Sequence, residues 1–317
     1  MISLLPDELK DRPLVLSMSG GKDSVATLLA MREAGLPDPV IVCADTGWEA
    51  LEWYKWMQRL PVLLGASVRM VSHVVEGLTA DEMAAAEEIE AALGISPSAM
   101  VRLMLQRALF PSRFMRFCTD ELKAKAMQEW LEEQGMDDAV RVTGVRAEES
   151  RARAAYPPVE WMRSAKQWHW RPILRWKLAD VLAIHQRHGI PLCPLYGRGV
   201  SRVGCWPCIP ASNKAELRIL VETDARRARA IELLEGHVQR LKRLKHGEAV
   251  AEWQMFPVQV PGTGRQSSSW AETVQWARTT RGGREADLQL GLWSRQEMSL
   301  PCRRMGMCDV GDDGFSC

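Results

Sequence analysis

The 317-residue sequence lacks several features that define whole classes of protein. No stretch approaches the ~20 consecutive apolar residues of a membrane-spanning helix, which argues against an integral membrane protein. Residues 1–12 carry Asp7, Glu8 and Asp11, where a secretory peptide would be basic and then apolar. We therefore expect a cytoplasmic protein that does not act at a membrane.

Cysteine is also scarce, since eight cysteines in a chain of this length are too few for a disulfide scaffold. In a reducing compartment, grouped cysteines are more often metal ligands or reactive thiols. The chain also lacks a large excess of charge of one sign, because its net charge is +1. The charges are unevenly distributed, however, since the net charge is −9 over residues 1–150, +12 over residues 151–246 and −2 over residues 247–317. The basic middle suits an anionic ligand such as a nucleotide, sulfate or nucleic acid, although ordinary surface solvation gives similar imbalances.

Short apolar runs alternate with amphipathic segments from residue 14 to about residue 205. This alternation predicts an α/β fold with an open, mostly parallel sheet covered by helices. The expected strands are Leu14–Met18, Val40–Ala44, Val68–Val75, Ala139–Thr143 and Arg171–Leu174. Helical periodicity begins at Val25, Leu122 and Leu178, and Thr79–Leu109 indicates two further helices broken near Gly94.

A boundary near residue 210 is expected from the change of pattern there. Residues 1–210 would form the nucleotide-binding domain, and residues 211–317 a helical and irregular carboxyl-terminal appendage. Helical periodicity continues to about Lys245, while Gly262–Ser269 and Thr279–Arg284 have the composition of loops. No internal repeat is visible.

The most informative segment is Ser19-Gly20-Gly21-Lys22-Asp23-Ser24, which lies between the first expected strand and the first expected helix. Two glycines at a helix start let backbone N–H groups converge on an anion, and the serine hydroxyls and the lysine add further donors. The spacing is not that of the G-x-x-x-x-G-K-[ST] loop. It resembles the PP-loop of the ATP pyrophosphatases, in which S-G-G-x-D-S grips the pyrophosphate of ATP.

Later motifs narrow the resemblance to the phosphoadenosine phosphosulfate (PAPS) reductase family over about residues 13–220. These motifs are Asp45-Thr46-Gly47, Arg116-Phe117-Cys118-Thr119, Gly144-Val145-Arg146 with Ser150 and Arg153, Pro194-Leu195-Tyr196-Gly197, and Cys205-x-x-Cys208. The resemblance implies an adenine nucleotide alpha hydrolase-like fold that binds ATP with Mg²⁺. It implies catalytic roles for Lys22, Asp23 and Asp45, and phosphate or nucleotide contacts from the Ser19–Ser24 loop. Further nucleotide contacts are expected from Gly144, Arg146, Ser150 and Arg153.

The cysteine motif has a metal-ligand spacing, since two thiolates two residues apart bind one ion or one cluster edge. In the family fold Cys118 faces Cys205 and Cys208, which implies an iron–sulfur cluster of the [4Fe–4S] type. Family members that carry such a cluster have a Cys-Cys pair where this chain has Phe117-Cys118. The fourth ligand is therefore Cys193, Cys302 or Cys308, or one iron stays open, and zinc or metal-free buried thiols are the alternatives.

The function that the resemblance implies is ATP cleavage to AMP and pyrophosphate, which adenylylates an acceptor for iron–sulfur-dependent sulfur transfer, as in nucleic-acid thiolation. The partners would be an adenine nucleotide, a sulfur donor protein or sulfide, and a nucleic-acid acceptor, and a homodimer is left open. A sulfonucleotide reductase is the alternative, but Cys308 lacks the Glu-Cys-Gly-hydrophobic-His context of the reductase nucleophile. A nucleotide-sensing regulatory protein is a third reading.

Thirteen tryptophans are many for this length, and several between Trp161 and Trp176 are interleaved with basic residues. Such a mixture either binds single-stranded nucleic acid or fills the core. The basic run His237–His246 is likewise a nucleic-acid patch or a solvated helix face. Cys43 is expected in the core.

Overall fold

The computed structural model describes residues 2–112, 114–200, 202–209, 214–248, 254–260 and 262–279, with the backbone alone at 214 and 215. The six strands are β1 (Leu14–Ser17), β2 (Val40–Ala44), β3 (Val68–Val71), β4 (Val140–Thr143), β5 (Val159–Met162) and β6 (Gln167–Trp170). The longer helices are α1 (Lys22–Glu33), α2 (Leu51–Leu64), α3 (Ala80–Leu93), α4 (Ala99–Arg107), α6 (Ala126–Glu133), α8 (Leu178–His188), α9 (Lys214–Thr223), α10 (Ala225–His246) and α11 (Trp270–Ala277). Short helical turns are η1 (Asp7–Leu9), α5 (Phe117–Thr119), η2 (Asp120–Lys125), η3 (Ala147–Glu149), α7 (Arg151–Ala154) and η4 (Pro194–Arg198).

The strands form one sheet in the order β3-β2-β1-β4-β6-β5, in which only β5 is antiparallel to its neighbour. The mostly parallel α/β fold predicted from the sequence is therefore confirmed. The chain runs outward from β1 to β3 and then returns to the other side of β1. The carboxyl ends of β1 and β4 consequently flank a topological switch point, where open α/β sheets bind their ligands.

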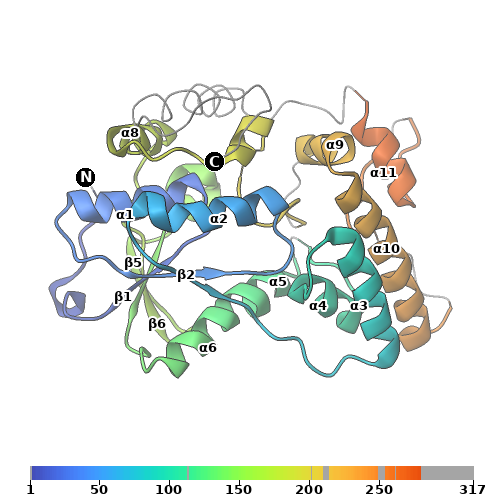
Figure 1. Ribbon diagram of the computed structural model, residues 1–317, viewed down its shortest axis with the longest axis horizontal. Coiled ribbons are helices and arrows are strands. Elements are labelled where there is room, and N and C mark those ends of the chain that lie inside the picture. The colour runs from blue at the N-terminus through green and yellow to red at the C-terminus, as the bar shows by residue number, and fades with distance from the viewer. Residues whose placement is uncertain are drawn as a thin grey trace.

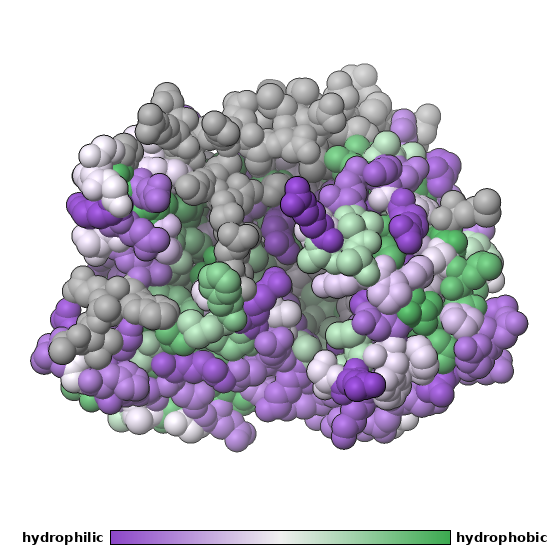
Figure 2. All heavy atoms as spheres, turned by 180° about the vertical axis from the view of Figure 1, so that it is seen from behind, coloured by the Kyte–Doolittle hydropathy of each residue, from purple (hydrophilic) through white to green (hydrophobic). Residues whose placement is uncertain are grey.

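Helices cover both faces of the sheet (Figure 1). Helices α1, α2 and α8 lie on one face and α6 lies on the other, while α3, α4 and α10 stack beside the sheet. Viewed from behind, hydrophilic side chains follow the lower rim, and hydrophobic ones lie deeper in the hollowed middle (Figure 2). Most of the buried apolar side chains belong to one cluster that continues from the sheet into α9 and α10.

One strand prediction is wrong and one hairpin was not foreseen. Residues Arg171–Leu174 form a turn rather than a strand, because Pro172 has no N–H for a sheet ladder and the Leu174 amide bonds back to the Arg171 carbonyl at 3.2 Å. The last parallel strand is β6, which pairs with β5 as a hairpin at the sheet edge. The third strand is also shorter than expected, since β3 ends at Val71.

The carboxyl-terminal region is helical where the structure describes it. Helices α9 and α10 confirm the periodicity predicted up to Lys245, whereas α11 was not predicted. Residues Gly262–Ser269 form the loop expected of them, and the segment predicted as a loop at Thr279–Arg284 lies outside the described residues after Thr279. The division of the chain at residue 210 stays a prediction. In the described part of the chain, no helix is both long and apolar enough to cross a membrane.

The basic run of α10 is occupied by ion pairs within the chain. His237, Arg240 and Lys245 lie 2.8, 3.7 and 2.7 Å from Glu88, Asp81 and Glu82, three acids on α3. Elsewhere Arg187 and Arg198 pair with Glu33 and Glu52. Acidic residues of the first part of the sequence thus form ion pairs with basic residues of the middle part. These ion pairs account for part of the opposite net charges of the two parts.

Candidate active site

The Ser19–Ser24 loop lies directly beyond the carboxyl end of β1 and leads into α1. Gly20 has φ +70°, and a Cβ there would lie 2.5 Å from the Met57 sulfur, so glycine is required on two grounds. Inside the loop, the Ser24 hydroxyl donates to the Gly21 carbonyl at 3.0 Å and accepts from the Ser19 amide at 3.2 Å. These short internal bonds hold the loop in one compact shape.

Two tryptophans of α2 fix the direction of the loop peptides. The indole N–H of Trp53 donates to the Ser19 carbonyl at 2.9 Å, and that of Trp56 donates to the Gly20 carbonyl at 2.8 Å. In a trans peptide the N–H points opposite to the C=O. The amides of Gly20 and Gly21 therefore point away from α2, as an anion-binding loop requires.

A charged chain of three residues lies at the start of α1. The Lys22 ammonium lies 3.1 Å from the Asp23 carboxylate, which in turn lies 2.5 Å from Arg146 Nε. Lys22 and Arg146 are both buried, with 6% and 5% of their surfaces exposed. Arg146 Nη1 also lies 2.6 Å from Glu148 Oε2, so two carboxylates balance the two cations and hold them at the start of α1.

Gly144 allows the loop after β4 to approach this charged chain. A Cβ at Gly144 would lie 2.7 Å from the backbone carbon and oxygen of Asp23 and 2.8 Å from the Ser24 nitrogen. Only glycine lets the end of β4 lie against the first turn of α1. This close approach joins two predicted motifs that are about 120 residues apart in the sequence.

Behind the loop lie two buried aromatic residues to which the sequence analysis gave no role. The Tyr196 hydroxyl accepts from the Lys22 amide at 3.2 Å, and His185 Nε2 lies 2.8 Å from the Lys22 carbonyl. Burial raises the pKa of Tyr196 and lowers the pKa of His185, so both side chains are neutral near pH 7. Both side chains hold the backbone of Lys22, and neither carries a charge that would pair with its ammonium group.

Asp45 follows β2 at the same edge of the sheet. Its Oδ1 accepts from the Gly47 amide and from the Tyr54 hydroxyl, each at 2.8 Å. The side chain also borders a cavity of about 450 Å³ whose lining includes His73 and Arg102. The Asp45 carboxyl group is also hydrogen-bonded to Glu49. A carboxylate beside a cavity suits a cation or a hydroxyl group.

The predicted cysteines lie around one cation, the half-buried Lys123. Its positive charge interacts with the sulfur atoms of Cys118, Cys205 and Cys208, and its ammonium is hydrogen-bonded to Cys205. The charge at Cys205 raises the pKa of Lys123, whereas burial raises the pKa of Cys205 to about 11 and also raises that of Cys118. Three thiols that are far apart in sequence are thus electrostatically linked through one lysine.

A buried carboxylate completes this cluster. Glu49 is 1% exposed, and its Oε1 lies 3.8 Å from Cys205 Sγ and accepts from the Thr46 hydroxyl at 2.8 Å. Burial raises the pKa of Glu49, which the nearby Lys123 charge partly opposes. The site therefore combines soft sulfur donors with one carboxyl group, that of Glu49, and one ammonium group, that of Lys123.

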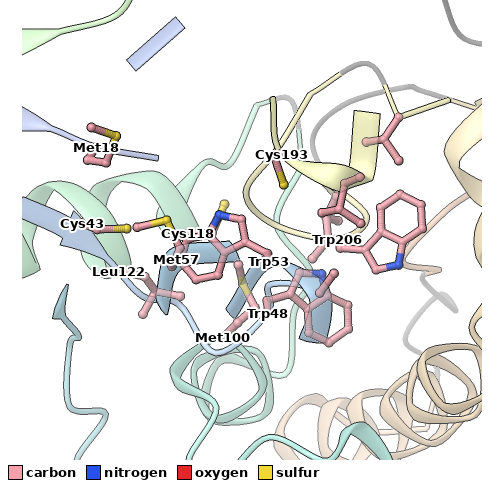
Figure 3. Close-up of a cluster of buried hydrophobic side chains, with 14 of the residues drawn as sticks. Met18, Cys43, Trp48, Trp53, Met57, Met100, Cys118, Leu122, Cys193 and Trp206 are labelled. Atoms are coloured by element: carbon pink, nitrogen blue, oxygen red, sulfur yellow. The ribbon is translucent and has the colours of Figure 1, made fainter. Parts of the chain in front are cut away.

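Helix α10 holds the cysteine loop against the loop that follows β2. Residues Glu49 and Cys205 form a β-bridge, the Trp206 amide donates to the Trp48 carbonyl at 2.9 Å, and the Trp48 indole donates to the Pro207 carbonyl at 3.1 Å. Arg227 donates to the carbonyls of Trp48 and Glu49 at 3.1 and 2.7 Å. Figure 3 shows Trp48, Cys118 and Trp206 in one buried cluster.

The remaining predicted site residues have different surroundings. Cys193 is buried, and the charged side chain that most affects its pKa is Glu52 rather than the cysteine cluster. Cys302 and Cys308 lie outside the described residues. Ser150 is exposed and caps α7, while Arg153 pairs with Glu149, so neither side chain is held in the loop cluster by a direct contact. Cys43 is in the core, as predicted, with 1% exposure.

Sequence reasoning missed Lys123, Glu49, Trp53, Tyr196, His185 and Arg227 as members of these sites. Tyr196 stands in a motif noted above, and Lys123 stands five residues after Cys118, so both carried a local signal. The roles of Glu49 and Arg227 depend on contacts between distant segments, for which a single sequence has no local signal.

Comparison with known proteins assigns the chain to a family. The model of the phosphoadenosine phosphosulfate reductase domain matches residues 13–211. An uncharacterised 37.8 kDa protein of Escherichia phage 186 is 32% identical over 311 residues, which cover 86% of this chain and 90% of that protein. The adenosine 5′-phosphosulfate reductase of Allochromatium vinosum is 36% identical over 75 residues, or 24% of this chain and 29% of that enzyme.

Among solved structures, the phosphoadenylyl-sulfate reductase of Candida auris in its phosphate complex aligns with a TM-score of 0.43 and 18% identity, over 62% of this chain and 84% of that one. The family assignment rests on the domain match, which covers more than half of the chain, and on the long phage relative. This chain is a member of the phosphoadenosine phosphosulfate reductase domain family.

Proposed function

We propose that this protein cleaves ATP between the α and β phosphates, transfers the adenylyl group to an acceptor, and delivers sulfur to that acceptor. The observation that carries the proposal is the intact Ser19–Ser24 loop, whose Ser19 and Gly20 carbonyls are held by Trp53 and Trp56 so that the Gly20 and Gly21 amides point away from α2. The Gly21 amide donates to the Ser19 hydroxyl at 3.3 Å. Those amides and Lys22 would stabilise the charge that develops on departing pyrophosphate. A substrate without a pyrophosphate leaving group cannot use this interaction.

Asp45 and the cations near it have complementary roles in this proposal. The Asp45 carboxylate would take Mg²⁺ or a ribose hydroxyl, since hard cations prefer carboxylate ligands. Asp23 would hold Lys22 and Arg146 in place by its two ion pairs. Gly144 would contact the nucleotide through backbone, because its side-chain position is filled by the start of α1.

The donor set at Lys123 fits an iron–sulfur cluster. Cys118, Cys205 and Cys208 offer three sulfur ligands, and the half-buried Lys123 would offset the negative charge of bound thiolates. Within the described residues, no group of three or more His, Cys, Asp or Glu side chains is already arranged around a single metal ion. A [4Fe–4S] cluster would supply the site that holds the sulfur for transfer. A nucleic-acid acceptor and a sulfide or protein sulfur donor remain part of the proposal.

The first test is ATP binding by calorimetry in the presence of Mg²⁺. Gly21→Asp places a carboxylate near the Tyr196 hydroxyl, since a Cβ at Gly21 would lie 3.2 Å from it, and should abolish binding by repelling phosphate. Equal affinity in this variant and the wild type would refute the role of the loop. Anaerobic purification followed by iron and sulfide assay tests the cluster, and stoichiometric zinc without iron would contradict it.

The competing function is sulfonucleotide reduction, which is favoured by the similarity to adenosine 5′-phosphosulfate reductases such as the Allochromatium vinosum enzyme. That enzyme aligns over only 24% of this chain. A reductase needs a thiolate nucleophile that attacks sulfur. The candidate for that nucleophile, Cys308, lacks the Glu-Cys-Gly-hydrophobic-His context of the reductase cysteine. ATP cleavage is therefore the better-supported reaction.

A further inference from the structure

An arginine that has no ionic partner among the described residues is buried in the sheet, away from the Ser19–Ser24 loop. Arg141 lies in β4, two residues before the end of the strand, and its Cα pairs with Val15 in the interior of the sheet. The residue is 5% exposed. Within the described structure, its Nε and Nη2 atoms are buried and have no hydrogen-bond partner.

Two neighbouring polar side chains share this lack of partners. The Cα of His169 in β6 pairs with that of Arg141, so both side chains leave the same face of the sheet, and Gln167 lies on that face two residues earlier. Gln167 is 1% exposed, and neither its amide nitrogen nor its amide oxygen has a partner in the described part of the chain. His169 Nε2 is likewise buried and unpartnered there.

The apolar half of the same face shows why this arrangement is unusual. Val15 and Val42 pack there against Met127 and Leu131 of α6, which is an ordinary hydrophobic contact. The row of paired residues across the sheet continues from Val15 to Arg141, His169 and Glu160. Beyond Val15 the side chains of this row are polar. Burying an unpaired charge is strongly unfavourable, so the Arg141 guanidinium favours binding of a negatively charged partner.

The one carboxylate in this row is engaged elsewhere. Glu160 lies 2.9 Å from Arg171, whose other nitrogen donates to the Pro157 carbonyl at 2.8 Å. Arg171 is therefore compensated and Arg141 is not. Burial alone lowers the pKa of Arg141 to about 10, and burial together with Arg141 and Arg171 lowers that of His169 to about 3. Near pH 7 the cluster consequently has one uncompensated positive charge, a neutral imidazole and a neutral amide.

We propose that Arg141, Gln167 and His169 bind a small oxyanion of the phosphate or sulfate type on the α6 face of the sheet. Nε and Nη2 form one edge of the guanidinium, which matches two oxygens of such an anion in a bidentate contact. The Gln167 amide supplies a further donor, and its oxygen accepts from an anion that retains a proton. Of the three residues, His169 is the most exposed, since it is half-buried. This site is separate from the Ser19–Ser24 loop, so it does not depend on the proposed function.

The test is the melting temperature of the full chain in chloride and in a few millimolar phosphate or sulfate at matched ionic strength and pH 7.5. The Gly21→Asp protein serves as the background, so that the anion response does not come from the Ser19–Ser24 loop. We expect a saturable rise in melting temperature with phosphate or sulfate in this background. A response to phosphate alone would identify a protonated anion that the Gln167 oxygen recognises.

Two variants separate the site from general salt effects. Arg141→Met replaces an unpaired cation by an apolar side chain of similar length, so it should fold and should lose the saturable response. Gln167→Glu supplies a carboxylate beside Arg141, so it should melt higher in chloride and no longer respond to the anion. A response that persists in Arg141→Met, or the absence of any response in the Gly21→Asp background, would overturn the proposal.

Discussion

The guanidinium of Arg227 lies 4.7 Å from the centre of the Trp48 ring and donates to the Trp48 carbonyl at 3.1 Å. The same side chain donates to the Glu49 carbonyl at 2.7 Å. A residue of α10 thus holds the loop that carries Glu49, and through the β-bridge it also holds Cys205. The carboxyl-terminal helices are therefore part of the cysteine cluster's support.

Replacing Arg227 by Met should lower the free energy of unfolding by about 2–4 kcal/mol, because two buried carbonyls lose charge-assisted donors. The loosened loop should also make Cys205 react faster with a thiol reagent. Chemical denaturation and thiol labelling measure the two effects. Arg229→Met on the same helix is the control, since Arg229 is exposed and pairs with the equally exposed Glu232, and should change stability by less than about 0.5 kcal/mol. Equal effects of both variants would contradict this role.

Gly144→Ala should reduce ATP cleavage roughly 10- to 100-fold, because even small displacements of catalytic groups have effects of this size. The new Cβ would lie 2.7 Å from the Asp23 backbone, so the start of α1 must move. The matched control is Gly236→Ala in α10, where a Cβ meets nothing within 4 Å. That change should stabilise the protein by about 0.5–1 kcal/mol without altering the rate of cleavage. An unaffected rate in Gly144→Ala would show that the loop tolerates the shift.

Lys123→Met should prevent stable cluster binding, because three thiolates would be left without the half-buried cation that offsets their charge. The measurement is iron and sulfide content after anaerobic reconstitution. Lys125→Met is the control, since Lys125 is exposed and lies 3.5 Å from Glu129 on the surface. Normal iron content in the Lys123 variant would rule out this charge-compensating role.

We expect Glu235 to make the free energy of unfolding depend on pH. The residue is 8% exposed and accepts from the Met255 amide at 2.9 Å, and burial raises its pKa from the usual 4.5 to about 7. Between these values the folded protein holds a proton that the unfolded chain has lost. The free energy of unfolding should therefore fall as pH rises from 4.5 to 7, by an amount on the order of 2–3 kcal/mol.

Glu235→Gln keeps an acceptor oxygen and cannot ionise, so its unfolding free energy should vary less over this range. Denaturation at pH 5 and at pH 7.5 gives the comparison. Glu232→Gln, at an exposed site on the same helix, should retain the wild-type pH dependence. If Glu235→Gln also retained it, Glu235 would not be the group responsible.

The parts of the fold that the sequence predicted well are those with a strong local pattern. Strands β1, β2 and β4 are short apolar runs buried in the sheet, and the first helix follows a glycine pair. The β5–β6 hairpin was missed because Trp161 and Glu160 keep it partly exposed at an edge, so its apolar pattern is weak. The mistaken strand at Arg171 began one residue after β6 ends.

The site was predictable to a similar degree. The Ser19–Ser24 loop and the Cys205-x-x-Cys208 pair are contiguous motifs whose chemistry follows from residue type. By contrast, Lys123 joins the cysteines, and Arg227 holds their loop, only because η2 and α10 fold against the segment after β2. Charge counts alone were misleading for α10, whose basic residues pair with the acids of α3.

The central claim is the site of bond cleavage, and product analysis tests it most directly. Anaerobically prepared protein would be incubated with α-labelled ATP, Mg²⁺, sulfide and a mixed pool of tRNA and DNA, beside a parallel reaction with adenylyl sulfate and reduced thioredoxin. We predict AMP and pyrophosphate in the first reaction, their loss in Lys22→Ala, and no sulfite in the second. Sulfite release from adenylyl sulfate without pyrophosphate from ATP would contradict the account and identify a reductase.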